Sequence, residues 1–570
     1  MKHIISLLML LVTELAAQWS NDPRVNTVWE QNENQGAPVI CTDGNGGAIV
    51  AWGSERGIFA NRVDKFGYRQ WGNNGVQVSP LRGFRTPTNI ITDGQGGAIV
   101  VWEDFTKSFE AGEQQRPENE MYVQRIDRQG KRLWDSSGVV IRERIVGTRI
   151  GDFQILSDDY LTFMLTWFDE RQSGQWYVQR IDLKGQIAFE LTGRLIPTES
   201  KIDNGRRIVV SDGNKGMLMA RFRQNADQTT VVDKITADGE FPWPQDGISV
   251  NTGGAFAMTS DGQGGAIIAG IYRISDPPNS IWEGRIQHID SIGQLLWGES
   301  GKIFTPAADV KTIPFIVEDG DSGAIVTWDD TTGVKRQRFI ARFDQNGTLK
   351  WKTDGFRLWY HSTIDPLVMS ALNGTMIWLI NDFDTPLGDL YAFTVDSSGV
   401  VRWGLDGVLI RYRNFEEWPY FLEATYDGQG GFVAVWSERR TSGWQNLVVQ
   451  QVSVHGRLGE VITSVEEVGG VRNQPAGFFL HPPFPNPLQP ITRINFFLHE
   501  PSHVSLRIVS LTGREVIRLV ERPLAQGNHT ISWEGRDQSG KEVVNGIYFC
   551  QLMVGTISQV RKILVIHYKE

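Results

Sequence analysis

The stretch TDGQGGAIVVW, residues 92–102, decides the fold because close copies of it return along the chain. The copies are TDGNGGAIVAW from Thr42, SDGQGGAIIAG from Ser260, EDGDSGAIVTW from Glu318 and YDGQGGFVAVW from Tyr426. Asp followed by glycines predicts a tight turn, because glycine reaches positive φ without steric cost and Asp bonds its own backbone. The apolar run after the turn predicts a strand that is covered on both faces.

Two markers count the copies. The Asp-Gly turn stands at Asp43, Asp93, Asp212, Asp261, Asp319 and Asp427, with degraded versions at Asp158 and Asn373. A D-x-x-G-x-x-x-W box first occurs at Asp64, Gly67 and Trp71 and decays in its eighth copy to Ser453, Gly456 and Glu460. Seven intervals separate Gly67 from Gly456, so the mean period is about 56 residues, which is typical of propellers and arrays.

Each unit carries signals for four short antiparallel strands. After the buried strand, MYVQRID from Met121 alternates apolar and polar residues, which predicts a strand with one better-buried face. The box then reverses the chain into a third strand that carries the Trp, and GVVI at Gly138 begins a fourth. Eight such units over residues 18–462 predict an all-β fold, an eight-bladed β-propeller, with seven blades or an open array as the alternatives.

Closure of the ring is predicted from the two ends of the repeat. The last copy, ending HGRLGEVITS, lacks the fourth strand, whereas DPRVNTV from Asp22 stands at a matching distance before Asp43. We therefore expect the N-terminal segment to supply the missing outer strand, which removes exposed strand edges.

Eleven tryptophans occupy the two repeat positions, and repetition favours a role in building the blades. They are Trp52, Trp102, Trp167, Trp328 and Trp436, and Trp71, Trp134, Trp243, Trp297, Trp351 and Trp403. The D-x-x-G-x-x-x-W box resembles the tryptophan-docking motif of pyrroloquinoline-quinone-type propellers, with one residue fewer between Asp and Gly. The resemblance concerns architecture, and no quinone cofactor is expected from it.

The N-terminus and the composition bound the compartment and the partners. Lys2, an apolar run from Ile4 to Val12 and Ala17 have the layout of a secretory signal peptide over residues 1–17. No later stretch is apolar enough to cross a membrane, so we expect a secreted or cell-surface protein. Acidic residues outnumber basic ones, 66 to 56, which disfavours nucleic acid as a partner. Only Cys41 and Cys550 are present, and they are expected to pack as small apolar side chains.

The repeat ends near residue 462. Residues 463–483 contain many prolines and predict a stiff linker, and residues 484–570 predict a small antiparallel sandwich of short alternating strands. FPNP from Phe484, TRINFFL, LTGREV, WEGRDQSGKEVVNGIYFCQL and RKILVI closely resemble the type A C-terminal sorting domain of the type IX secretion system and the related FlgD-like immunoglobulin fold.

The resemblance implies export across an outer membrane through this C-terminal domain, with the export machinery as a partner. The matching positions are Pro485, Asn486, Pro487, Gly513, Gly546, Tyr548 and Lys562. His499 and Ser510 depart from the family's usual residues at a strand end and a turn. A purely structural Ig-like module is the alternative.

Two metal motifs have structural interpretations. HEPSH, residues 499–503, matches the H-E-x-x-H zinc pattern, but Pro501 disfavours the helix that the pattern needs, so a strand end and turn are expected. DGDSG from Asp319 offers oxygen atoms to calcium but too few for a complete loop, so a turn is favoured. No metal or other cofactor is expected.

Candidate binding residues stand where the repeat is broken. Aromatic residues gather in two connections between units, at Trp359, Tyr360 and His361 and at Trp418 and Tyr420. Flat rings with polar neighbours on loops commonly hold sugars or peptide side chains; the structural alternative is that they fill space between blades. The loop from Glu103 is a further insertion, and the repeated carboxylates Asp104, Asp169, Asp330 and Glu438 predict structural ion pairs.

These observations favour a non-enzymatic propeller that binds an extracellular glycan or protein. No nucleophile motif, nucleotide loop or His cluster is present to assign a reaction. The alternative is a polysaccharide hydrolase or lyase with acidic residues near the propeller axis, since two carboxylates facing a sugar can come from distant repeats.

Overall fold

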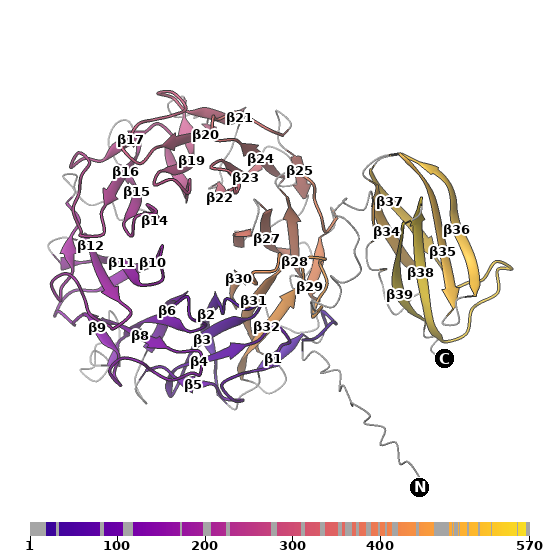
Figure 1. Cartoon of the computed structure of the whole chain (residues 1–570), viewed down its shortest axis with the longest axis horizontal. Coiled ribbons are helices and arrows are strands. Elements are labelled where there is room, and N and C mark those ends of the chain that lie inside the picture. The colour runs from indigo at the N-terminus through magenta and orange to yellow at the C-terminus, as the bar shows by residue number, and fades with distance from the viewer. Residues whose placement is uncertain are drawn as a thin grey trace, which may run out of the picture. The chain divides into compact units, whose positions relative to one another are not determined.

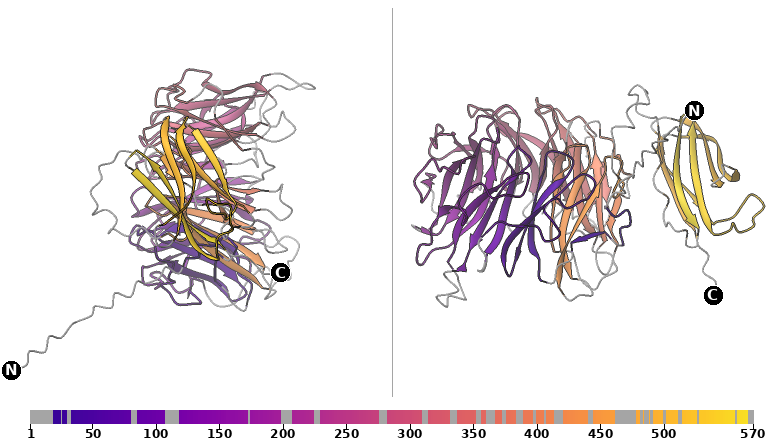
Figure 2. Two further views of the ribbon diagram at one scale, coloured as in Figure 1. Left: turned by 90° about the vertical axis from the view of Figure 1, so that its right-hand side faces the viewer. Right: turned by 60° about the horizontal axis from the view of Figure 1, so that its bottom comes forward.

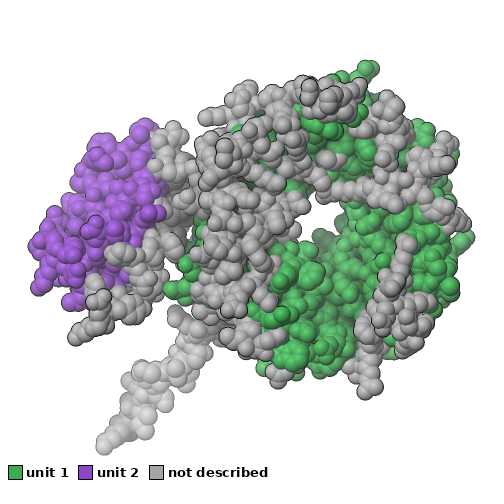
Figure 3. All heavy atoms as spheres, turned by 180° about the vertical axis from the view of Figure 1, so that it is seen from behind, with its two compact units in different colours: residues 1–461 green, residues 462–570 purple. Residues whose placement is uncertain are grey.

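The computed structural model resolves the chain into two compact units, Met1–Val461 and Ile462–Glu570, coloured green and purple in Figure 3. It describes residues 19–565 except 25, 30–32, 80–84, 107–117, 172–173, 198–206, 224–228, 275–281, 309–313, 331–336, 352–355, 360–366, 372–374, 383–388, 397–398, 405–406, 413–419, 440–443, 461–477, 481–482, 484–487, 489–490, 499–500, 511–513, 526 and 556. All named elements among these residues are strands.

The described part of unit 1 forms eight four-stranded antiparallel sheets. Sheets 1 and 2 are β2 (Gly36–Thr42), β3 (Ala48–Ser54), β4 (Gly57–Val63), β5 (Val76–Gln77) and β6 (Arg85–Thr92), β7 (Ala98–Asp104), β8 (Glu120–Ile126), β9 (Val139–Arg142). Sheets 3 and 4 are β10 (Ile150–Leu156), β11 (Thr162–Asp169), β12 (Gln175–Asp182), β13 (Arg194–Leu195) and β14 (Arg207–Ser211), β15 (Met217–Arg223), β16 (Thr229–Ile235), β17 (Ile248–Val250).

The second half of unit 1 continues the same order. Sheets 5 and 6 are β18 (Gly254–Ser260), β19 (Ala266–Arg273), β20 (Trp282–Ile289), β21 (Lys302–Ala308) and β22 (Phe315–Glu318), β23 (Ala324–Asp330), β24 (Gln337–Phe343), β25 (Phe356–Trp359). Sheets 7 and 8 are β26 (Leu367–Ala371), β27 (Thr375–Asp382), β28 (Asp389–Val395), β29 (Val408–Arg411) and β30 (Tyr420–Tyr426), β31 (Phe432–Arg439), β32 (Gln445–Val452), β1 (Thr27–Trp29).

The sheets of unit 1 stand around a ring, with their first strands innermost (Figures 1 and 2). Each first strand contacts the first strand of the next sheet, and β30 of sheet 8 contacts β2 of sheet 1. The prediction that the N-terminal segment completes the last sheet is confirmed, because Thr27 pairs with Val449 and Trp29 with Leu447. Figure 3 shows an opening at the centre of this ring.

The second strand of a sheet is its most buried element, as the repeated apolar run predicts. Residues Ala98 to Trp102 of β7 are all buried, and the equivalent residues of β3 are buried as well. The recurrent glycine at the start of the fourth strand makes room for the Trp: a Cβ on Gly138 would lie 2.5 Å from the Trp102 ring. Within sheet 2 the Trp of the second strand therefore packs against the glycine that precedes the fourth.

The strand MYVQRID was predicted to have one better-buried face. It forms β8, the third strand of sheet 2, and both of its faces are buried, so this prediction is wrong. Gln124 of β8 is fully buried, since its side chain is consumed by the following turn. Its Nε2 donates to the Asp135 carbonyl at 2.7 Å, and its Oε1 accepts from the Trp134 N–H at 3.1 Å. Gln124, a polar residue in the middle of this strand, is therefore buried with its hydrogen bonds satisfied.

The predicted strand that carries the box Trp is wrong, because Trp71 and Trp134 lie between the third and fourth strands of their sheets, where they dock onto the neighbouring sheet. The Trp71 indole N–H donates to the Arg128 carbonyl of sheet 2 at 3.0 Å, and a Cβ on Gly130 would lie 2.9–3.0 Å from the Trp71 ring. Trp134 repeats this contact with Leu183 and Gly185 of sheet 3. The box glycine is required because it has positive φ and because the indole lies directly on it.

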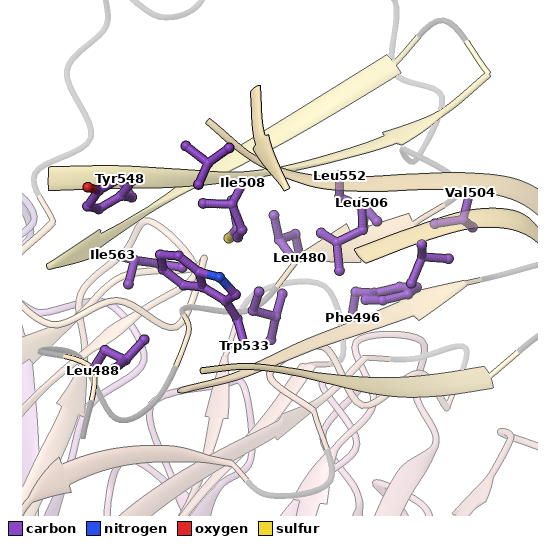
Figure 4. Packing of buried hydrophobic residues seen from close by; sticks show 14 of the residues in the cluster. Leu480, Leu488, Phe496, Val504, Leu506, Ile508, Trp533, Tyr548, Leu552 and Ile563 are labelled. Carbon is purple, nitrogen blue, oxygen red and sulfur yellow. The ribbon is translucent and has the colours of Figure 1, made fainter. Parts of the chain in front are cut away.

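Unit 2 contains two antiparallel sheets among its described residues. Their orders are β33 (Phe478–Leu480), β34 (Thr492–Leu498), β37 (Gly527–Trp533) and β36 (Glu515–Leu524), β35 (Ser502–Ser510), β38 (Gly546–Val554), β39 (Ile557–Val565). Phe496, Leu506, Trp533, Leu552 and Ile563 belong to the apolar core shared by the two sheets (Figure 4).

Two sequence expectations for this region meet the structure directly. The range predicted as a linker, 463–483, contains β33, whose Phe479 pairs with Phe497 of β34, so sheet residues begin before the predicted boundary. Around HEPSH, β34 ends at Leu498 and β35 begins at Ser502, as expected for a strand end and turn. Cys41 and Cys550 are both free and buried, as predicted.

Candidate functional site

The two ends of the sheets in unit 1 have different connections. One end, here the turn face, carries the Asp-Gly turns between first and second strands and the boxes between third and fourth strands. The other end, the connection face, carries the links between second and third strands and the links from one sheet to the next. Contacts between neighbouring sheets show that the same ends of the sheets lie on the same face. On the turn face, Trp71 bonds the box of the next sheet, and on the connection face, Asn119 bonds Ile150 at the start of β10.

The turn face is uniform and internally bonded. In seven of the eight sheets five residues separate the first strand from the second. Within the turn of sheet 2, Asp93 Oδ1 accepts from the Gln95 and Gly97 N–H groups at 2.8 Å, while Oδ2 accepts from Arg125 Nε at 3.0 Å. Asp319 uses its two carboxylate oxygens in the same way, with Arg342 as the cation. The carboxylates of Asp93 and Asp319 therefore stabilise their turns through both oxygens.

The connection face is variable. Two residues separate β3 from β4, whereas fifteen separate β7 from β8. The links between sheets also differ in length, from three residues between β17 and β18 to eleven between β13 and β14. Binding and catalytic residues are disproportionately found on such loops, held by a rigid scaffold. The connection face is therefore the candidate functional surface.

Bulges recur where the innermost strands start on the connection face. The register shifts in β2, β6, β10, β18 and β30, each time within the first few residues of the strand. Three bulge residues have positive φ without being glycine: Ala37 at 45°, Asp152 at 53° and Phe421 at 53°. A bulky side chain in this conformation is uncommon and strained, and such strain gathers at functional sites.

Tyr420 is the predicted binding residue whose side chain the structure describes. It begins β30, is 45% exposed and stands beside Phe421, which is 58% exposed. Trp359 ends β25 on the connection face, where its backbone pairs with Arg338; its side chain lies outside the described atoms. Tyr360, His361 and Trp418 lie outside the described residues, so the predicted grouping of these five residues stays a prediction.

Phe421 is an exposed aromatic residue of the candidate surface that the sequence analysis did not select. Its neighbours in the chain, Trp418 and Tyr420, were selected because aromatic residues interrupt the repeat there. The bulge that turns Phe421 outward is a backbone feature, and no residue type in YFLEATY announces it. The excess of aromatics before a first strand was the available signal.

The connection face also holds a carboxyl with a perturbed pKa. Burial raises the pKa of Glu103 to about 7, although Arg149 and the hydrogen bond from Asn119 act against this and Asp152 adds to it. Asn119 Nδ2 donates to Glu103 Oε1 at 2.7 Å and to the Ile150 carbonyl of sheet 3 at 2.9 Å. Glu103 therefore sits at the seam between sheets 2 and 3, at the root of the long insertion.

A second carboxyl lies on the innermost strand of sheet 8. Glu423 of β30 is exposed, yet desolvation by the surrounding strands raises the pKa of its carboxyl above the ordinary value. Glu103 and Glu423 are thus two described carboxyls of unit 1 whose pKa values burial raises.

The repeated carboxylates after the second-strand Trp form ion pairs, as expected, and some of their partners come from the neighbouring sheet. Asp169 pairs with Arg171 of its own loop at 2.8 Å and also with Arg142 of sheet 2 at 3.0 Å. Glu438 of sheet 8 pairs with Arg411 of sheet 7 at 2.9 Å. These pairs join neighbouring sheets. Asp104 pairs within sheet 2, with Arg85, and the Asp330 side chain lies outside the described atoms.

No group of three or more metal-ligating side chains occurs among the described residues. Within the same residues, no helix is long and apolar enough to cross a membrane.

The positions that match the sorting-domain family are partly described. Gly546 begins β38, and Tyr548 is buried against Trp533 with its hydroxyl donating to the Val544 carbonyl at 2.9 Å. Lys562 lies in β39, where its backbone pairs with Phe549. Pro485, Asn486, Pro487 and Gly513 lie outside the described residues.

The ring of four-stranded antiparallel sheets defines an all-β, propeller-like protein. No protein-family model and no curated protein matches the sequence.

Solved structures give weak similarities. The polysaccharide lyase Uly1 is 10% identical with a TM-score of 0.35, covering 66% of this chain and 91% of that chain. An alpha-L-arabinanase from Penicillium chrysogenum is 10% identical with a TM-score of 0.30, covering 67% and 99%. PorZ, an essential bacterial surface component of the type-IX secretion system of Porphyromonas gingivalis, is 10% identical with a TM-score of 0.16, covering 94% and 99%. Similarities of this size assign neither a family nor a function.

Proposed function

We propose that residues 18–462 form an eight-bladed β-propeller of a secreted or cell-surface protein, and that its connection face binds an extracellular macromolecule, a glycan or a protein. One observation carries the proposal: β30 presents Tyr420 and Phe421 as adjacent exposed aromatics, with Phe421 held outward at positive φ. Aromatic rings are the side chains that most often dominate binding energy at such surfaces.

The turn face supplies a contrast that supports this choice. Its Asp, Gln and Trp side chains are consumed by bonds within and between the sheets, so few of them are left to meet a ligand. The connection face combines variable loops with exposed rings and with Glu103, a carboxyl of raised pKa. Variable loops on a repeated scaffold are a common source of binding specificity.

A glycan array probed with the mature chain tests the proposal. Alanine variants of Phe421, Tyr420, Trp359 and Trp418 are expected to weaken binding at least tenfold. Tyr160→Ala is the matched control, because Tyr160 is 45% exposed and has a φ of 55°, yet it lies in a turn of the opposite face. Equal losses from Tyr160→Ala and Phe421→Ala, or binding untouched by all connection-face variants, would contradict the assignment.

If no glycan binds, a protein ligand is tested instead. The mature chain is cross-linked to purified cell-surface proteins, and the cross-linked residues are mapped. Cross-links confined to the connection face support the proposal, and cross-links on the turn face contradict it.

Cleavage of a polysaccharide on the same face is the second candidate, and Glu103 is its specific support. A general acid needs a carboxyl that keeps its proton near neutral pH, which a pKa of about 7 provides. Release of sugar ends from acidic and neutral polysaccharides is measured for the mature chain and for Glu103→Gln between pH 5 and 8. Activity that is lost in the variant supports the candidate; activity that survives removes Glu103 from it.

We further propose that unit 2 is an Ig-like sorting domain for a type IX-like export route. Two packed antiparallel sheets with Gly546 and Tyr548 at strand β38 support this. A fluorescent reporter fused to residues 462–570 is expected to reach the surface of a bacterium that has this export system, and to stay inside when residues 557–570 are deleted. Export of the truncated fusion would contradict the proposal.

A further inference from the structure

The eighth box lacks the residue that the other sheets use for docking. Glu460 stands where the Trp belongs, and its carboxylate accepts hydrogen bonds from Ser453 Oγ at 2.5 Å and His455 Nδ1 at 2.8 Å and pairs with Arg457. Burial favours a higher pKa for Glu460, but these partners outweigh it and lower the pKa to about 2. Sheet 8 therefore has no indole of its own to place on sheet 1.

Trp19 occupies the empty docking position. It is 5% exposed, and its indole N–H donates to the Lys65 carbonyl at 3.0 Å, which matches the bond from Trp71 to Arg128. A Cβ on Gly67, the box glycine of sheet 1, would lie 2.7 Å from the Trp19 backbone nitrogen and 2.9 Å from its ring. On the other side, a Cβ on Gly459 of sheet 8 would lie 3.0 Å from the Trp19 Cβ.

The residues after Trp19 hold sheets 7, 8 and 1 together. The Ser20 carbonyl accepts from Gln450 Nε2 at 2.9 Å, and Asn26 Nδ2 donates to the Ile410 carbonyl at 2.8 Å. β1 then pairs with β32, and the buried Trp29 packs edge-on against Trp52 of sheet 1. The segment from Trp19 to Trp29 thus spans the seam between the last and first sheets on both faces.

We propose that residues Trp19–Trp29 act as a clasp that closes the ring last and releases first, with Trp19 as the docking residue that sheet 8 lacks. Its partners in sheets 7 and 8 are nearly the whole unit away in sequence, so the clasp forms after the other seams. At the other seams, adjacent sheets are also joined by a continuous chain. When the clasp leaves, the β32 edge at Leu447–Val449 becomes unpaired.

Hydrogen exchange on the full mature chain tests the clasp. In Trp19→Ala, amides of β1 and of residues 447–449 are expected to exchange at least tenfold faster, while those of β19 in sheet 5 keep their rates. Trp19→Phe retains the ring but lacks the N–H that bonds Lys65, so an intermediate increase is expected.

Trp134→Ala is the matched control, because Trp134 makes the same docking contact between sheets 2 and 3. It is expected to speed exchange there and to leave β1 unchanged. Unchanged exchange of β1 in Trp19→Ala, or equal acceleration of all sheets, would overturn the proposal.

If Trp19→Ala does not fold, the wild-type chain decides. In rising denaturant its β1–β32 amides are expected to open before those of the equivalent β8–β9 pair, and simultaneous opening would overturn the clasp.

Discussion

At the residue scale, one repeated aspartate makes two kinds of bond in the turns of sheets 1, 2, 5 and 6. Asp93 caps the backbone of its own loop with one oxygen and holds the guanidinium of Arg125 with the other. Asp43 does the same with Arg62, and Asp261 with His288. In these sheets the buried carboxylate thereby joins the turn to the third strand. Because the Asp carboxylate makes both bonds, Asp recurs in most copies of the turn, whereas the residue between the glycines varies from copy to copy.

Replacing this aspartate tests the first residue-scale claim. Asp93→Asn keeps the size of the side chain but leaves the buried Arg125 without its carboxylate, so the free energy of unfolding is expected to fall by about 3–5 kcal/mol. Glu240→Gln at the exposed Arg194–Glu240 pair is the control, with an expected loss of about 0–1 kcal/mol. Thermal unfolding of both variants measures the difference; equal losses would contradict a structural role for the buried pair.

The raised pKa of Glu103 predicts a pH dependence. Between pH 4.5, the ordinary value, and about 7, the folded chain binds more protons at this carboxyl than the unfolded chain does, so stability falls as pH rises. Glu103→Gln keeps the acceptor for Asn119 and removes this slope. Denaturant titrations of both chains at several pH values are expected to show stability curves that diverge through this window. Parallel curves would place the Glu103 pKa at its ordinary value.

At the element scale, glycines set the distance at which strands and tryptophans meet. Gly138 begins the fourth segment of sheet 2 with a φ of 86°, and the Trp102 ring and the Val123 carbonyl lie on either side of its missing Cβ. Gly75 and Gly193 hold the same position against Trp52 and Trp167. A single small residue per sheet therefore decides whether the large ring fits.

A pair of glycine substitutions separates crowding from backbone conformation. Gly138→Ala is expected to lower the free energy of unfolding by about 2–4 kcal/mol. The alanine would have to adopt a positive φ, and its Cβ would clash with the Trp102 ring. Gly147→Ala has a similar φ of 79° with nothing within 4 Å of the new Cβ, so about 1 kcal/mol is expected. Chemical denaturation measures both, and equal losses would mean that the Trp102 contact is not tight.

At the scale of the whole molecule, the two units have separate cores. The apolar cluster of unit 2 is built from residues between Leu480 and Val565, and the clusters of unit 1 are shared between neighbouring sheets around the ring. A ring of this kind distributes its core over many interfaces, so its stability depends on each seam.

Removal of unit 2 tests this separation. A chain of residues 18–461 is expected to unfold within about 2 °C of the corresponding transition in the mature chain, because it keeps all of its core contacts. Scanning calorimetry measures the two unfolding transitions of the mature chain and the single transition of the chain 18–461. A large drop for the shorter chain would show that the units stabilise each other.

The sequence alone determined the repeat, the buried second strands and the closure by the N-terminal segment. Each of these is written in local patterns: Asp-Gly spacing, runs such as Ala98–Trp102, and a missing strand at one end matched by a spare one at the other. Local patterns are readable because turn geometry and strand burial depend mainly on nearby residues.

Tertiary structure alone decided which polar groups are buried and which residues face a ligand. Gln124 belongs to a strand that was expected to have one less buried face, yet the turn that follows the strand buries its side chain. Trp19 is buried between the box of sheet 1 and Gly459 of sheet 8, which only closure of the ring brings together. Phe421 faces outward because a bulge shifts the register of β30. Sequence patterns cannot carry this information, since bonds between residues hundreds of positions apart and the dihedral angles of one strand residue depend on how the sheets finally pack.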